Sequence, residues 1–76
     1  MKIVNSKKIV FEIGKCYRHT TGQEMHVIGE LDTVMYGNTL VAETTKNTDL
    51  TCVGRSHHNA VNWKEISHQE WMKNFS

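Results

Sequence analysis

The sequence predicts a small, mostly β (α+β) domain of five to six strands with one short C-terminal helix. Short apolar and β-branched stretches recur along the chain, separated by glycine or polar turn residues, as is typical of sheet proteins. The C-terminal end changes from strand periodicity to helical spacing behind a capping motif. Because 76 residues allow only one domain, residues 1–76 are expected to fold as a single unit.

The first predicted strand covers residues 9–13. Its alternation would place Ile9, Phe11 and Ile13 on one face, and Gly14 would end it.

A hairpin is predicted next, between residues 15–19 and residues 24–28. The intervening residues 20–23 have the composition of a compact turn, in which Gly22 provides a positive φ at no steric cost. This hairpin is the clearest β element of the sequence.

The second half of the chain predicts three further strands and a connection. Residues 29–38 show no clean periodicity and are expected to join two strands. In the last strand, Val61, Trp63 and Glu65 would share one face. The predicted strands are residues 39–43, 50–54 and 60–65, separated by a turn at 44–49 and a polar loop at 55–59.

The helix begins with a capping box in which Ser67 is the N-cap and Glu70 stands at the third helical position. Ile66 and Trp71 occupy the positions of the hydrophobic staple that accompanies this box. A helix of at most about three turns is marginal alone in water. We therefore expect it to dock on the sheet, and we expect the sheet to be either a small bent sheet or an SH3-like barrel.

Composition limits the classes of partner. The formal net charge is +1 and the pI is about 7.8, so nucleic acid is not the expected ligand. No apolar run approaches a membrane span, and residues 1–8 lack the apolar segment of a signal peptide. Two cysteines, Cys16 and Cys52, are too few for a disulfide framework. We expect a cytoplasmic protein with two free thiols, a disulfide between them being the alternative.

Neither a metal nor a cofactor is expected. The available donors lack a recognised ligand spacing, so we interpret the histidines among them as exposed or rim side chains. These donors are His19, His26, His57, His58, Cys16 and Cys52. A thiolate–imidazole pair of Cys52 with His57 or His58 is conceivable, but a cysteine buried in a strand would be inert. We therefore expect no enzyme.

Two candidate binding segments remain. Residues 33–38 place Met35, Tyr36 and Asn38 in a predicted loop, where apolar side chains indicate either a contact surface or a cap on the barrel end. A polar cluster of Arg55, His57, His58 and Asn62 could recognise an anionic, nucleotide-like molecule, or it could simply be a solvated loop.

Three segments carry a resemblance to small uncharacterised proteins encoded by bacteriophages. They are Gly14-Lys15 with Tyr17-Arg18-His19 and Gly22, Met35-Tyr36-Gly37 with residues 40–43, and Asn62-Trp63 with Glu65-Ile66 and Glu70-Trp71. The first segment also resembles a bacterial SH3-like domain family of unknown function. The phage resemblance implies an accessory protein that acts in a bacterial host and that could counter host defence.

The leading functional expectation is a non-enzymatic homo-oligomer that sequesters a small anionic nucleotide-derived ligand. Its ligand-binding residues would be Met35, Tyr36, Asn38, Arg55, His57 and Asn62. The alternatives are a protein-interaction module that docks on a host protein through residues 34–36, and a weak nucleic-acid binder using Lys7, Lys8, Lys15 and Arg18.

Overall fold

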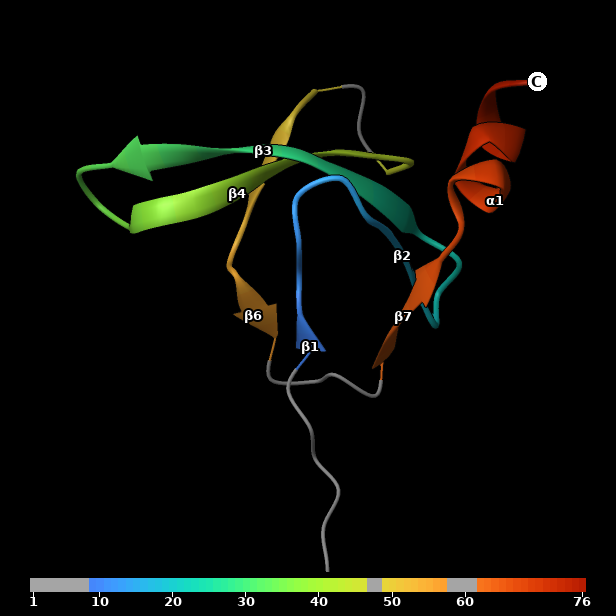
Figure 1. Cartoon of the computed structure of the whole chain (residues 1–76), viewed down its shortest axis with the longest axis horizontal. Helices are drawn as coiled ribbons and strands as arrows, with labels where there is room; N and C mark the ends of the chain where they lie inside the picture. The colour runs from blue at the N-terminus through green and yellow to red at the C-terminus, as the bar shows by residue number, and fades with distance from the viewer. Residues whose placement is uncertain (1–8, 47–48, 58–61) are drawn as a thin grey trace, which may run out of the picture.

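The fold is known from a computed structural model that describes residues 9–46, 49–57 and 62–76 (Figure 1). Five antiparallel strands form the main sheet in the order β5-β4-β3-β2-β7, and β1 and β6 form a separate pair. The elements are β1 (Ile9–Val10), β2 (Cys16–His19), β3 (Glu24–Thr33), β4 (Gly37–Thr44), β5 (Thr51–Val53), β6 (Ser56–His57), β7 (Trp63–Ile66), α1 (His68–Met72) and the 3-10 turn η2 (Lys73–Phe75).

The prediction of a mostly β fold with one short C-terminal helix is confirmed. Of the two predicted architectures, the bent sheet is the one that forms. In the described residues the main sheet ends at β5 and β7 and does not close into a barrel. Both edge strands are short, which limits the backbone they leave open to pairing with other chains.

The first predicted strand is only partly formed. Pairing with β6 stops at Val10, and the chain then crosses the face of the sheet that carries the hydrophobic core. Phe11 is buried there, and its amide donates to the Arg55 carbonyl at 2.9 Å. The prediction that Ile13 shares the face of Phe11 is wrong: Ile13 is exposed, because the chain turns at Gly14, where φ is +91°, to enter β2.

The first predicted hairpin is confirmed. β2 pairs with β3 so that Cys16 lies opposite His26 and Arg18 lies opposite Glu24. The turn between them contains Gly22 at φ +98°, and its amide donates to the His19 carbonyl at 2.9 Å.

A second, longer hairpin occupies the region that was predicted to be an irregular connection. β3 continues to Thr33, and β4 begins at Gly37, directly opposite Thr33. The register shifts between Val27 and Gly29, which marks a β-bulge at Ile28. Beyond the bulge no residue of β3 is buried, so no apolar alternation is required on either face, and this explains why the sequence shows no clean strand period here.

The last strand is displaced from its prediction. β7 covers Trp63–Ile66, whereas residues 60–65 were predicted. Val61, which was expected to share a face with Trp63, lies outside the described residues.

The hydrophobic core lies on one face of the sheet. It is covered by the chain segment that carries Phe11, and the Phe11 ring packs edge-on against Tyr17 and Trp63. Burial of the Tyr17 phenol in this core raises its pKa. The buried cluster consists of Phe11, Tyr17, Met25, Val27, Leu40 and Ala42, with Val53 and Trp63 packed against it.

The opposite face of β2 and β3 is covered by the helix. The predicted N-cap is confirmed, since the Glu70 amide donates to the Ser67 hydroxyl at 3.1 Å, while the Glu70 carboxylate accepts from Arg18. Trp71 is 3% exposed and packs near His26, with ring centroids 5.8 Å apart. The predicted docking of the helix on the sheet is therefore confirmed.

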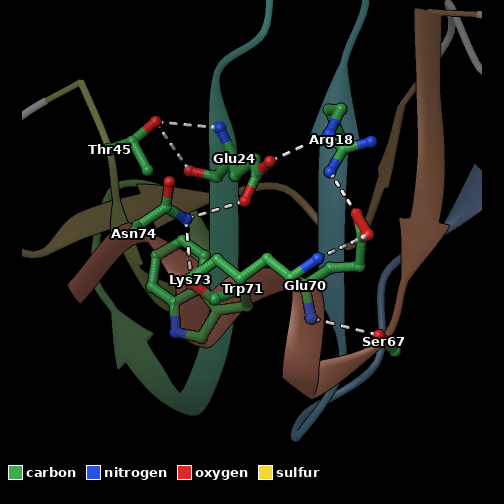
Figure 2. A network of polar contacts seen from close by, with 8 residues as sticks. All are labelled: Arg18, Glu24, Thr45, Ser67, Glu70, Trp71, Lys73 and Asn74. Atoms are coloured by element: carbon green, nitrogen blue, oxygen red, sulfur yellow. Dashed lines mark hydrogen bonds and ion pairs between the residues drawn. The ribbon is translucent and has the colours of Figure 1, made fainter. Parts of the chain in front are cut away.

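A polar network joins this helix to the strands (Figure 2). The Arg18 guanidinium donates to the Glu24 carboxylate at 2.8 Å and to the Glu70 carboxylate at 2.6 Å. Asn74 donates to the other Glu24 oxygen at 2.7 Å. Hydrogen bonds with Glu70 and Glu24 raise the pKa of Arg18, and Arg18 in turn lowers the pKa of Glu70.

Trp71 should be the main apolar anchor of the helix. We expect Trp71→Ala to lower the free energy of unfolding by about 3 kcal/mol or more, because a large buried ring is removed. The neighbouring Met72 is 57% exposed, and Met72→Ala should cost less than about 1 kcal/mol. Urea unfolding followed by tryptophan fluorescence and circular dichroism measures both values. Equal losses for the two variants would contradict this packing.

Arg18 should stabilise the fold by compensating the buried Glu24 carboxylate. We expect Arg18→Met to cost about 1–2 kcal/mol in urea unfolding, since a buried acceptor loses its charged donor. Lys15→Met is the matched control, because Lys15 forms exposed ion pairs with Glu12 and Glu65 at 3.4 and 3.8 Å. Exposed pairs contribute little, so the control should stay within about 0.5 kcal/mol of wild type. The same loss in both variants would contradict the role of Glu24.

Candidate functional site

The long β3–β4 hairpin projects beyond the rest of the sheet (Figure 1). Its tip carries apolar side chains that contact solvent. Val34, Met35 and Tyr36 are between 78% and 102% exposed, and Leu31 is also exposed on the strand leading to them. These four residues are called the hairpin tip below.

The backbone of the tip is held firmly. The Thr33 hydroxyl accepts from the Tyr36 amide at 2.9 Å and donates to the Gly37 carbonyl at 3.0 Å. Gly37 adopts φ +68°, which a residue with a side chain rarely accepts. A fixed turn therefore presents Val34, Met35 and Tyr36 outward. The alternative prediction, in which this segment folds back as a cap, is wrong.

Polar side chains line the hairpin behind the tip. Arg55 donates through Nε to Asn38 Oδ1 at 2.8 Å, and its Nη2 pairs with the Glu30 carboxylate. Asn38 also donates to Asp32 Oδ1 at 2.7 Å. Arg55, which was predicted to lie in a polar loop, thus ties the segment after β5 to the hairpin, and its charge is paired with that of Glu30.

An open groove of about 570 Å³ lies beside this array. Three of the predicted binding residues, Tyr36, Asn38 and Arg55, line it together. Met35 belongs to the hairpin tip and is not part of the groove lining. The lining residues are Tyr36, Asn38, Thr39, Cys52, Gly54 and Arg55.

Of the other two predicted residues, the structure separates Asn62 from these three and does not describe the side chain of His57. Asn62 lines a different groove together with His19 and Trp63, and its carbonyl accepts from the Thr20 amide at 3.0 Å. His57 belongs to β6, but its side chain lies outside the description of the structure. His58, the fourth member of the predicted polar cluster, is outside the described residues.

The two cysteines are free and differ in environment. Cys16 is buried, and its desolvation raises the pKa of the thiol. Cys52 was expected to be buried, but it is exposed, because it lies on the outer side of the edge strand β5 while Thr51 and Val53 are partly covered.

A further group of polar side chains was not recognised in the sequence. Cys16, His26 and His68 offer ligand atoms that all lie within 4.8 Å of one another. The first two could have been found, because a hairpin closed by residues 20–23 places positions 16 and 26 opposite each other. His68 depends on where the helix docks, and no local pattern reveals that.

Comparison with known proteins does not assign this chain to a protein family. No family model matches the chain, and neither a curated protein nor a solved structure shows a significant match. Within the described residues, no helix has the length and apolar character needed to cross a membrane.

Proposed function

We propose that this chain is a non-enzymatic binding protein that docks on another protein through the hairpin tip. The observation that carries the proposal is the exposure of Val34, Met35 and Tyr36 at the end of a projecting hairpin whose turn is closed by hydrogen bonds of Thr33. Clustered apolar side chains on a surface are typical of contact sites.

The shape of the tip favours a protein as the occupant. Small molecules bind in concave sites that cover most of their surface. The tip is convex and formed by a single turn, so an apolar hollow on a larger molecule would be its complement. Met adapts to irregular surfaces and Tyr combines a flat ring with a hydroxyl, which suits both to such an interface.

The charges around the tip support the same interpretation. Arg55 is paired with Glu30, and Asp32 is hydrogen-bonded to Asn38, so the residues behind the tip form a polar rim. An apolar centre with a polar rim is the usual anatomy of a protein interface. The resemblance to phage-encoded proteins adds a bacterial host protein to the proposal as the class of partner.

Site-specific photocrosslinking tests this proposal. A photoreactive amino acid at position 34, expressed in the cells that naturally make the protein, should give one defined adduct with another protein. With the adduct partner purified, Met35→Ser and Tyr36→Ala should each weaken affinity by about 2 kcal/mol, as expected at the centre of an interface. Calorimetry measures the affinity, and the free energy of unfolding should stay within about 0.5 kcal/mol of wild type.

Position 46 provides the control for this experiment. Lys46 is exposed but lies beyond the end of β4, away from the turn at residues 34–36. The same adducts from positions 34 and 46 would contradict the proposal. An adduct between two copies of the chain would instead make the tip the self-association surface of the expected homo-oligomer.

A second candidate function is binding of a small nucleotide-derived ligand in the adjacent groove. It is favoured by one observation, namely that Tyr36, Asn38 and Arg55 line the same groove. Tyr36 would stack on a base and Arg55 would meet a phosphate. Because Glu30 already holds Arg55, an anion would have to compete with that carboxylate.

The test of this candidate is calorimetric titration with cyclic and linear nucleotides. Binding should weaken by about 10-fold or more in Arg55→Ala and in Tyr36→Ala. Asn62→Ala is the control, since Asn62 lines another groove, and it should bind as wild type does. Wild-type protein that binds none of these compounds would eliminate the small-ligand function.

A further inference from the structure

Three side chains of types that can ligate a metal converge on the sheet face that the helix covers. Cys16 on β2 lies directly opposite His26 on β3, so both side chains leave the same face. α1 begins at His68 and places this third donor beside them. The ligand atoms of the three residues lie within 4.8 Å of one another.

The imidazole of His26 is oriented by a carboxylate. Its Nδ1 is hydrogen-bonded to Glu43 Oε2 at 2.8 Å, which leaves Nε2 as the nitrogen available to a metal. Metal-binding histidines commonly donate their other nitrogen to a carboxylate, which fixes the tautomer and makes the ligand more basic.

The imidazole of His68 is oriented in the complementary way. Its Nε2 lies 2.7 Å from the carbonyl oxygen of Gly14, which leaves Nδ1 available. The two rings stand nearly perpendicular, at 81°, with their centroids 5.1 Å apart. Both histidines thus have the outer hydrogen bond that supports a metal ligand.

We propose that Cys16, His26 and His68 form a site for Zn²⁺. A thiolate and two imidazoles are ligands that zinc prefers, and the tetrahedral geometry of the ion leaves a fourth position. His68 is exposed, so this position opens to solvent and accepts water or a donor from a partner. The positive charge remaining after one thiolate binds would be partly balanced by the carboxylate of Glu43.

The distances require only a small closure. Around tetrahedral zinc, sulfur and nitrogen ligands lie about 3.5 Å apart, given metal–ligand bonds of about 2.0–2.3 Å. The present separations of up to 4.8 Å therefore need side-chain movements of about 1 Å. His68 can make them, because it is exposed at the first residue of α1.

The site would link three elements that are distant in sequence. Zinc would join β2, β3 and α1, and so reinforce the helix docking already provided by Trp71 and Arg18. No metal was expected from the sequence, because Cys16, His26 and His68 have no local ligand spacing and His68 was not among the candidate donors. The proposal depends on the long-range position of the helix and does not depend on the hairpin tip.

Metal titration of the full chain tests the site. Protein freed of metal with a chelator should bind one Zn²⁺ per chain, and zinc should raise its melting temperature. Co²⁺ should give a thiolate-to-cobalt charge-transfer band and the strong visible absorption of a tetrahedral complex. His68→Gln and Cys16→Ser should each abolish this band or weaken zinc binding at least about 10-fold, and Glu43→Gln should weaken it about 10- to 100-fold.

Two controls separate this site from other donors. Cys52→Ser removes the exposed thiol, and the double variant His57→Gln/His58→Gln removes the tandem histidines; both should bind zinc as wild type does. His68→Gln alters an exposed side chain, so its result stands even if a substitution at the buried Cys16 prevents folding. Wild-type protein without zinc binding at micromolar concentration, or binding unchanged in His68→Gln, would overturn the proposal.

Discussion

The buried carboxylate of Glu24 is the constraint on which the arrangement of sheet and helix depends. Glu24 is only 8% exposed, and a buried charge is costly unless it is paired and hydrogen-bonded. Arg18 on the neighbouring strand and Asn74 beyond the helix supply those partners (Figure 2). Because Arg18 also donates to Glu70, the guanidinium that balances the charge of Glu24 in the sheet also holds the helix. The C-terminal segment is therefore required to complete the sheet surface.

The register of β2 and β3 determines which polar side chains lie at each end of the sheet. Pairing Arg18 with Glu24 also places Cys16 opposite His26, so the ion pair and the sulfur–nitrogen pair follow from a single alignment. The bulge at Ile28 then shifts the alternation, and beyond it Glu30 and Asp32 meet Arg55 and Asn38. One end of the sheet thus binds the chain's own helix, while the other end is free to project.

Local signals in the sequence predicted the parts of the fold that short-range physics determines. The turn around Gly22 and the capping of α1 by Ser67 both depend on residues within a few positions of each other, and both are confirmed. The length of the β3–β4 hairpin was not predictable in this way, because the projecting part of β3 has no buried residue and therefore needs no apolar alternation. The pairing of Arg55 with Glu30 and the approach of His68 to Cys16 depend on long-range docking. Of the predicted site residues, Tyr36 and Asn38 come together because they share one hairpin, whereas Arg55 joins them through docking that no local pattern predicts.

The exposure of the hairpin tip has a physical explanation in the way the hairpin is stabilised. Strand pairing from Thr33 back to Met25, together with the Thr33 hydroxyl bonds, holds the turn without help from the side chains of Val34 and Met35. Exposed apolar side chains that contribute little to folding can change without loss of the fold, so their chemistry is free to suit a partner. Folding requirements act on Glu24, Arg18 and Trp71 instead. The residues that folding requires therefore lie at one end of this small domain, and the exposed apolar hairpin tip lies at the other. A substitution in the surface proposed for recognition can thus leave the stability of the fold unchanged.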